Sequence, residues 1–182
     1  MKASYIIRRI TMKKIMVLVL LSATLFAKSN TQKIGDILAV GIPAIAYGST
    51  FYMDDDDGRG EFYWAYGITM ATTVALKHTV REKRPDNNDR DSFPSGHTAS
   101  TIGSAVFVHR RYGLKYALPL YAGALYTAYS RVHVNRHHPR DVIAGAVIGA
   151  ISSWYFVDPL QKLSVTPKVG SDYKGIQVNY RF

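Results

Sequence analysis

The sequence predicts an all-α protein, a compact helical bundle of about five to six helices embedded in a membrane, with a short β-like tail at the C-terminus. A chain of 182 residues with 47% hydrophobic residues is long enough for one domain with its own core. Five apolar segments of helical length follow one another, rich in Ala, Gly, Thr and Tyr, a composition that favours close helix contacts. The alternative is a soluble all-α protein, because the mean hydropathy is close to zero.

The N-terminal segment, residues 1–27, has the features of a targeting sequence. It contains five positive charges and no acidic residue, and an apolar run from Ile15 to Phe26 follows them. The run is short for a membrane span, which needs about 20 apolar residues. Ala27 suits a cleavage site, whereas Leu25 stands where a small residue is preferred. We therefore expect a signal peptide or an N-terminal anchor, and an exported or inserted chain in either case.

The predicted helices follow in order, with polar turns between them. They cover residues 34–52, 62–80, 98–109, 115–130 and 142–157. Gly145 and Gly149 in the last segment are four residues apart, which permits close backbone approach. The acidic turn at 54–57 is interpreted as a solvated loop rather than a calcium site, because no glutamate follows at the required spacing. Arg110 and Arg111 favour the cytoplasmic side, which the acidic turn would share.

The tail, residues 159–182, changes character after the helical region at 28–158. Apolar and polar residues alternate near the C-terminus, which predicts a strand. Residues 164–169 could pair with it across a turn at 170–172. One hairpin cannot close a barrel, so we expect a docked or loose tail.

The first stretch with chemical potential is a cationic helix end. Lys77, Arg81 and Arg84 are spaced at i, i+4 and i+7, so a helix would place them on one face. Pro85 is expected to end that helix. Cations without a local counter-charge attract an anion, although a solvated basic helix end would have the same sequence.

The second stretch, Pro94 to His97, is predicted to be a turn that opens a helix. Gly96 allows the backbone to approach a ligand closely, and free amides at a helix start attract anions. His97 would lie at the rim of this anion site. The simpler interpretation is a capped turn in which Ser95 is the N-cap.

The third stretch combines an arginine, a histidine and a carboxylate. Pro139 suits the first turn of the last helix, which places Asp141 one turn beyond His137. A carboxylate bonded to one imidazole nitrogen makes the other nitrogen a better nucleophile. Arg131 offers a planar fork for phosphate oxygens.

Composition restricts the remaining chemistry. The chain has no cysteine, which excludes disulfides, thiolate metal sites and a cysteine nucleophile. His133, His137 and His138 do not repeat a ligand spacing and have no acidic cluster beside them, so we expect no metal and no cofactor. The net charge of +10 suits anionic lipids or phosphorylated substrates. We expect no nucleic acid partner, because no run of Lys and Arg interleaves with aromatic residues.

The order and spacing of these stretches are more specific than any one of them. The pattern is Lys77, six residues, Arg84-Pro85; Pro94-Ser95-Gly96-His97; Ser130-Arg131, five residues, His137, three residues, Asp141. It resembles the type 2 phosphatidic acid phosphatase (PAP2) superfamily in all three motifs, with no motif position substituted. The resemblance covers about residues 34–157, and it implies that 28–158 form a phosphatase domain with its site at one rim of a bundle.

The resemblance also implies a role for each motif residue in a phosphohistidine mechanism without metal. His137 would attack phosphorus, with Asp141 orienting it. His97 would protonate the leaving oxygen and later help to activate water. The phosphate-binding residues would be Lys77, Arg84, Ser95, Gly96 and Arg131.

We therefore expect a phosphatase that acts on a lipid phosphate monoester or pyrophosphate. Candidate substrates are undecaprenyl pyrophosphate, phosphatidylglycerophosphate, phosphatidate and lipid A phosphate. The expected location is the bacterial inner membrane, with the active site facing the periplasm. Three alternatives remain open: a soluble periplasmic acid phosphatase of broad specificity, a vanadium haloperoxidase, and a lipid-phosphate binder without catalysis. The sequence does not select the lipid or the oligomeric state.

Overall fold

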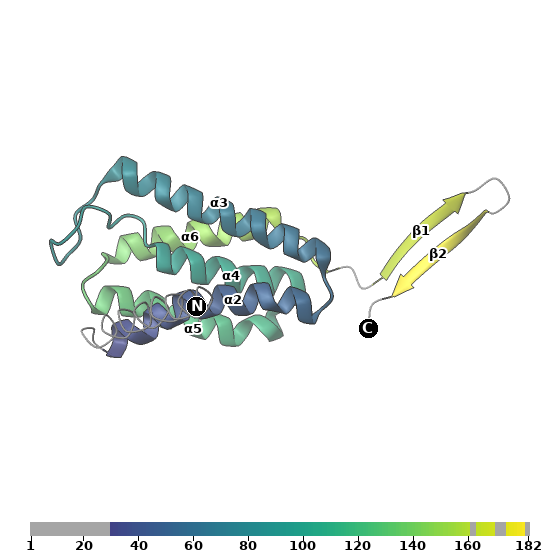
Figure 1. Cartoon of the computed structure of the whole chain (residues 1–182), viewed down its shortest axis with the longest axis horizontal. Coiled ribbons are helices and arrows are strands. Elements are labelled where there is room, and N and C mark those ends of the chain that lie inside the picture. Colours follow the sequence, from purple (N-terminus) through teal and green to yellow (C-terminus); the bar gives the residue numbers. More distant parts are fainter. Residues whose placement is uncertain (1–29, 161–162, 170–173, 181–182) are drawn as a thin grey trace, which may run out of the picture.

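The computed structural model describes residues 30–160, 163–169 and 174–180. Its elements are α2 (Asn30–Tyr52), α3 (Asp56–Val80), α4 (Gly96–Tyr112), α5 (Leu114–His133), α6 (Pro139–Phe156), β1 (Leu163–Val169) and β2 (Lys174–Tyr180). Figure 1 shows the five helices side by side with their long axes roughly parallel. The predicted all-α class is confirmed, and each predicted apolar segment coincides with a different helix. The predicted signal peptide or anchor at 1–27 lies outside the described residues.

Helix α4 is the centre of the bundle and packs against α2, α3, α5 and α6. Its closest neighbour is α6, because glycine allows the two backbones to touch. A Cβ atom on Gly145 would lie 2.4 Å from the carbonyl oxygen of Ser95, and one on Gly149 would lie 2.3 Å from that of Ala99. The predicted close approach is thus confirmed. It joins the first turns of the two helices, where the Ser95 amide donates to the Asp141 carbonyl at 2.9 Å.

The bundle buries many small polar side chains beside an apolar core that includes Phe62 and Phe107, and it exposes many large apolar side chains. Fully or almost fully buried polar residues include Thr50, Thr69, Thr73, Thr98, Thr101, Thr127 and Ser130. Several of these hydroxyls are satisfied within their own helix, as when Thr73 donates to the Thr69 carbonyl at 2.8 Å. Large exposed apolar residues include Ile37, Val40, Trp64, Leu125, Ile143, Ile151 and Trp154.

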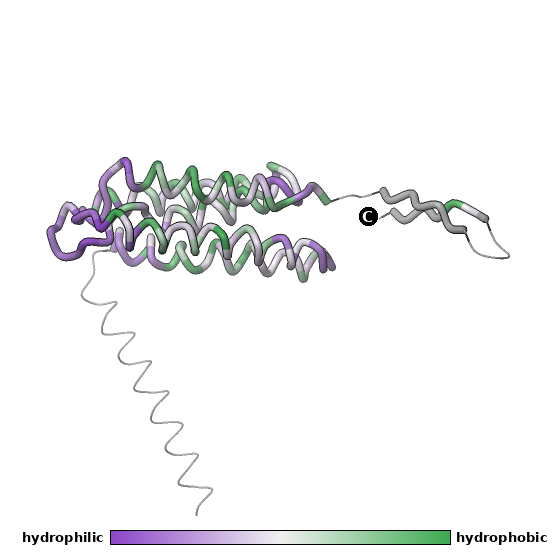
Figure 2. Tube along the Cα trace, turned by 90° about the horizontal axis from the view of Figure 1, so that it is seen from above, coloured by the Kyte–Doolittle hydropathy of each residue, from purple (hydrophilic) through white to green (hydrophobic). Residues whose placement is uncertain are grey.

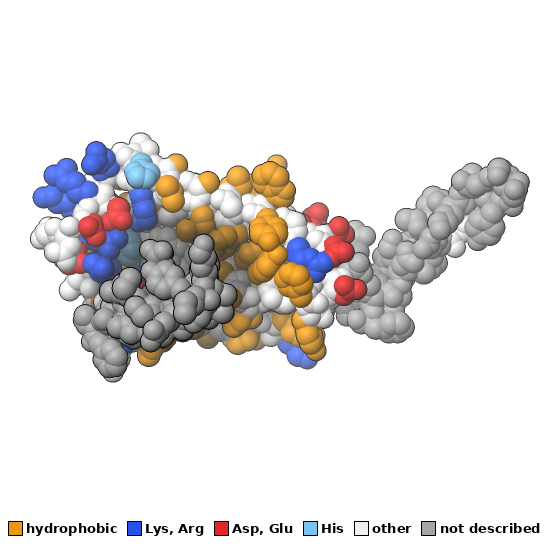
Figure 3. Space-filling model, viewed as in Figure 1, with side chains coloured by type: hydrophobic (Ala, Val, Ile, Leu, Met, Phe, Trp, Pro, Cys, Tyr) orange, Lys and Arg blue, Asp and Glu red, His pale blue; other side chains and the backbone are white. Residues whose placement is uncertain are grey.

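Charge and hydropathy follow the long axis of the bundle. Figure 2 shows hydrophilic residues concentrated near both ends of the helices. Figure 3 shows Lys, Arg, Asp and Glu side chains gathered at the two ends, with hydrophobic side chains between them. Among the helices of the described ranges, α2 is long and apolar enough to cross a membrane, with a mean hydropathy of 1.4 and 22% of that window buried.

The end of the bundle that carries the turn between α2 and α3 holds a buried ion cluster. Arg111 at the end of α4 lies 2.6 Å from Asp55 and 3.0 Å from Glu61, and the Tyr112 hydroxyl donates to Asp55 at 2.9 Å. The interpretation of the acidic turn as a solvated loop is therefore wrong for Asp55, which is fully buried as the N-cap of α3. The contact does confirm that this turn and Arg111 lie at the same end.

The C-terminal tail forms an antiparallel pair of strands, β1 and β2, in which Val165 lies opposite Val178. The alternation in the sequence predicted this pairing correctly. The turn predicted at 170–172 lies outside the described residues. The boundary between a phosphatase domain and the tail remains a prediction.

Candidate active site

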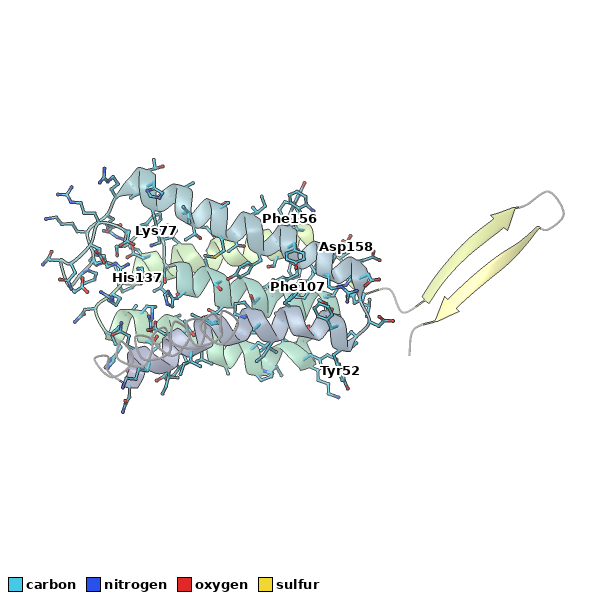
Figure 4. The ribbon with its side chains drawn as sticks, viewed as in Figure 1. Tyr52, Lys77, Phe107, His137, Phe156 and Asp158 are labelled. Atoms are coloured by element: carbon cyan, nitrogen blue, oxygen red, sulfur yellow. The ribbon has the colours of Figure 1, made fainter. Side chains whose placement is uncertain are left out.

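The three motif stretches meet at the end of the bundle opposite Asp55. Figure 4 shows Lys77 and His137 at this end, far from Tyr52 and Asp158 at the other. A cavity of about 510 Å³ opens here. Its lining residues are Gln32, Asp36, Ala39, Val40, Lys77, Arg84, Asp91, Gly96, His97, Arg131, Arg136 and His137. Six of the eight predicted site residues therefore line one cavity, and the other two, Ser95 and Asp141, are buried beside it.

His137 lies in the turn between α5 and α6, where it is buried and has one defined hydrogen bond. Its Nδ1 lies 2.7 Å from the carbonyl oxygen of Ser92. A carbonyl oxygen only accepts, so Nδ1 carries the proton and Nε2 keeps its lone pair. Burial, and then the charges of Lys77 and Arg84, lower the pKa of His137 to about 4. The side chain is therefore neutral near pH 7, with an unprotonated nitrogen available for attack.

Asp141 acts on His137 from a distance rather than through a direct bond. Its Oδ2 lies 3.7 Å from Nδ1 of His137 and accepts from the Ser92 hydroxyl at 2.5 Å and the His138 amide at 2.8 Å. The carboxylate–imidazole bond expected from the sequence is replaced by a bond to Ser92. Oδ1 of the buried Asp141 has no hydrogen-bond partner among the described residues. The nearest cation recorded for this oxygen is Nε of Arg140, 4.0 Å away, so the negative charge is only partly compensated next to the imidazole.

The first motif does not continue as a helix to Pro85. Helix α3 ends at Val80, because Arg81 adopts a left-handed conformation with φ of 48°. The predicted shared helical face of Lys77, Arg81 and Arg84 is therefore wrong. The chain turns instead, and Arg84 reaches the cavity from a loop.

Lys77 and Arg84 still meet, because both bind Asp91. The Lys77 ammonium donates to the backbone carbonyl of Asp91. Arg84 donates to Oδ1 of the same residue from Nε at 3.0 Å, and its Nη2 lies 2.9 Å away. Asp91 thereby holds two cations on one wall of the cavity.

Arg131 also lines the cavity and is almost completely buried. It donates from Nη1 to Asp36 at 2.7 Å, from Nη2 to the Gln32 carbonyl at 3.1 Å and from Nε to the Ser130 hydroxyl at 3.0 Å. A guanidinium has five N–H groups, so two remain after these three bonds to described residues. The contact depends on Gly35, where a Cβ atom would lie 2.4 Å from Nη2 of Arg131.

His97 shares its carboxylate partner with Arg131. Nε2 of His97 lies 3.2 Å from Oδ1 of Asp36, the same oxygen that accepts from Arg131. The His97 side chain is 41% exposed, so a ligand in the cavity can reach it. Asp36 therefore couples two predicted site residues from α4 and α5.

The start of α4 contributes backbone amides. Ser95 is the N-cap, and its fully buried hydroxyl accepts from the Thr98 amide at 3.5 Å. Ser95 therefore caps the helix and does not line the cavity, as the simpler interpretation of this turn predicted. Gly96 does line it. The amides of Gly96 and His97 belong to the first turn, where no intrahelical acceptor exists, so they can bind an anion.

Four residues of the site escaped prediction: Asp36, Ser92, Asp91 and Arg136. Asp36 had a usable signal, because it is the one charged residue in the apolar segment 34–52. Ser92 and Asp91 had none, since their role comes from backbone carbonyls as well as side chains. Arg136 lines the cavity and lies 3.1 Å from Asp86.

Taken together, the cavity is lined by four Lys and Arg side chains and two carboxylates. Within the described ranges, no three His, Asp or Glu side chains gather as metal ligands would. Cations and helix-start amides around a neutral imidazole can hold a phosphate and let nitrogen attack it. This is the arrangement of a phosphatase.

Comparisons with known proteins support the assignment as a phosphatase. Residues 60–163 match the model of the PAP2 superfamily. A lipid A 4'-phosphatase of Helicobacter pylori is 32% identical over 157 residues, and the match covers 79% of this chain and 79% of that protein. The chain belongs to the PAP2 superfamily and is a hydrolase of phosphate esters.

A second sequence relative and one solved structure are also similar to this chain. An undecaprenyl-diphosphatase of Bacillus subtilis is 30% identical over 139 residues, which cover 76% of this chain and 64% of that protein. The crystal structure of Aquifex aeolicus LpxE superimposes with a TM-score of 0.54 at 21% identity, covering 76% of this chain and 93% of that one. The latter shows a shared fold.

Proposed function

We propose that this protein removes phosphate from a lipid in the membrane through a phosphohistidine intermediate. The observation that carries the proposal is the buried, neutral His137, whose unprotonated Nε2 belongs to a cationic cavity. Lys77, Arg84 and Arg131 bind the phosphate oxygens, and Gly96 adds its amide. Charge on these oxygens grows during transfer, so fixed cations stabilise the transition state more than the ground state.

The first chemical step transfers the phosphoryl group to His137. Nε2 forms a bond to phosphorus, and the bond between phosphorus and the lipid oxygen breaks. His97 gives a proton to the departing oxygen. The imidazole gains positive charge in this step, which the incompletely compensated carboxylate of Asp141 stabilises at 3.7 Å.

The second step releases phosphate. His97, now neutral, accepts a proton from a water molecule that attacks phosphorus, and the bond between phosphorus and Nε2 of His137 breaks. The enzyme returns to its starting state with His97 protonated. Asp36 favours this protonated form, because a carboxylate 3.2 Å from an imidazole stabilises its charge.

The outer surface of the bundle supports a membrane location. Large apolar side chains face outward along the middle of the helices, while charges gather at the ends (Figure 3). Water would penalise this distribution and lipid would not. The cavity lies at one end, where a lipid phosphate at the membrane surface could enter it.

The sidedness follows from the N-terminal segment. Whether 1–27 is a signal peptide or an anchor, its positive charges stay in the cytoplasm and its C-terminal end emerges outside. Helix α2 begins at the cavity end, since Gln32 and Asp36 line the cavity. The site therefore faces the periplasm of the inner membrane.

Sidedness is tested with single cysteines, because the chain has none. One replaces the exposed Asn88 near the cavity and one replaces the exposed Leu114 at the start of α5. An impermeant maleimide applied to spheroplasts should label position 88 and spare 114. Equal labelling of both would contradict a membrane bundle and support a soluble periplasmic phosphatase.

Lipid A phosphate is the first substrate to test, because a relative that matches across 79% of both chains is named for it. The purified protein in detergent would receive lipid A, undecaprenyl diphosphate, phosphatidylglycerophosphate and phosphatidate, and released phosphate would be measured. We expect turnover of at least one lipid, unaffected by EDTA. Binding without phosphate release would contradict the proposal, and loss of activity on chelation would contradict a metal-independent mechanism.

A further inference from the structure

A second cavity of about 530 Å³ adjoins the active site. Its lining residues are Val74, Lys77, His78, Arg81, Asp89, Arg90 and Asp91. Lys77 and Asp91 line both cavities, so they form a shared wall. Nothing in the proposed mechanism uses the other residues of this second cavity.

The second cavity has a surplus of positive charge. The side chains of His78, Arg81 and Arg90 form no ion pair or hydrogen bond with other described residues. The two carboxylates present are directed to Arg84 instead: Asp91 lies 2.9 Å from Nη2 and Asp89 lies 3.7 Å from Nη1. Two permanent cations and a histidine thus line a cavity whose two carboxylates are both paired with Arg84.

The backbone at Arg81 adds an independent observation. Arg81 ends α3 with φ of 48°, a conformation that is unfavourable for most L-residues and that glycine or asparagine adopts more readily. An unfavourable conformation at a cavity wall suggests that the side chain is kept for a function. The left-handed turn directs the chain so that residue 81 lines the second cavity.

We propose that this cavity binds a second phosphate group of the same lipid substrate while the first is hydrolysed. This inference rests on the proposed function, because the first phosphate must occupy the cavity around His137. The ligand chemistry is a lipid with two phosphoryl groups, either joined as a diphosphate or placed separately on one headgroup. Guanidinium groups bind phosphate oxygens in pairs, and Lys77 on the shared wall contacts both groups.

The test compares a double variant with a control of equal charge. Arg81→Gln/Arg90→Gln removes two exposed cations from the second cavity and leaves the predicted catalytic residues intact. Lys83→Gln/Lys115→Gln removes two exposed cations outside both cavities. Both variants should keep the wild-type melting temperature, since all four side chains are exposed.

The substrates come in matched pairs, farnesyl diphosphate with farnesyl phosphate and bisphosphorylated with monophosphorylated lipid A, in neutral detergent. The Arg81/Arg90 variant should lose about tenfold in kcat/KM on lipids with two phosphates, because charge-assisted contacts are lost. On lipids with one phosphate the loss in kcat/KM should be less than about twofold. The control should match the wild type. A selective loss on the two-phosphate member of either pair supports the proposal. The pair in which this loss occurs identifies how the two phosphates are arranged.

Two results would overturn the subsite. One is an equal loss on lipids with one and two phosphates, which would indicate general attraction of an anionic aggregate. The other is no loss on any lipid. If the wild type hydrolyses none of them, the proposed function fails, and the subsite is tested by calorimetry: pyrophosphate should bind more tightly than phosphate, and the Arg81/Arg90 variant should remove that difference.

Discussion

The two ends of the bundle use buried charge in opposite ways. At the end opposite the cavity, Arg111 lies within 3.0 Å of two carboxylates, Asp55 and Glu61. At the cavity end, the buried carboxylate of Asp141 has one oxygen without a hydrogen bond among the described residues. Arg131 likewise has two N–H groups that no described residue accepts from. A cluster whose charges satisfy one another stabilises the fold, whereas a cluster with unused capacity can bind a ligand.

The titration of one group at each end shows the same contrast. Burial alone would raise the pKa of Asp55, but hydrogen bonds from Arg111, the Gly58 amide and Tyr112 outweigh it, so the pKa of Asp55 lies below its usual value. At the cavity, burial and the charges of Lys77 and Arg84 act together to lower the pKa of His137 to about 4. The first group is kept charged by its partners, and the second is kept neutral and reactive.

The largest expected effect is the loss of the proposed nucleophile. His137→Ala should reduce turnover by at least about 10³-fold while the protein stays folded, because no other group can form the covalent intermediate. Phosphate release from a lipid and the melting temperature would be measured together. His133→Ala is the matched control, since His133 is exposed and lies outside the cavity. Near-normal turnover in His137→Ala would contradict the proposed mechanism.

The second prediction concerns Asp36, which joins Arg131 to His97. Asp36→Asn should lower kcat by about 10- to 100-fold on a lipid phosphate, because His97 is less readily protonated. This is part of the roughly 10²- to 10⁴-fold that general acid–base catalysis contributes. On p-nitrophenyl phosphate, whose leaving group needs little protonation, the loss should be much smaller. The alkaline limb of the pH profile should also move to lower pH.

Asp57→Asn, an exposed position at the opposite end, is the control for Asp36→Asn. Equal losses on both substrates, with an unchanged pH profile, would show that Asp36 supports the fold of the site rather than proton transfer. Asp36→Glu should recover part of the activity if the carboxylate itself is what matters.

The third prediction tests the ion cluster at the end of the bundle opposite the cavity. Arg111→Met leaves the buried Asp55 without its main counter-charge, which should lower the free energy of unfolding by about 3 kcal/mol. The turnover number per folded molecule should remain within about twofold of wild type, because the cavity lies at the other end and shares no partner with Arg111. Adding Asp55→Asn should recover part of the stability. A fall in turnover at full stability would contradict the separation of the two ends.

Sequence patterns predicted the helices and the motif residues, because apolar segments and short motifs are local signals. Sequence patterns did not predict side-chain contacts between residues that are far apart in the chain. Asp36 and Arg131 are 95 residues apart, and Asp55 and Arg111 are 56 apart, so neither pair was foreseen. The left-handed turn at Arg81 was missed for a different reason, since an arginine there gives no sign of that backbone conformation.

The smallest expected effect is the response to mild acid, which separates the two ends by titration. The unfolded chain takes up a proton on His137 below about pH 6.5, while the folded protein resists until about pH 4. His137 therefore adds stability that is complete above pH 6.5 and is lost as the pH falls toward 4. The melting temperature of wild type should decline over this range more steeply than that of His137→Gln, which lacks the group. Arg111→Met should also flatten this slope, but through Asp55 at the other end, because the pKa of the buried Asp55 rises once its hydrogen bonds from Arg111 are lost. Identical slopes for wild type and His137→Gln would show that His137 is not held neutral by the fold.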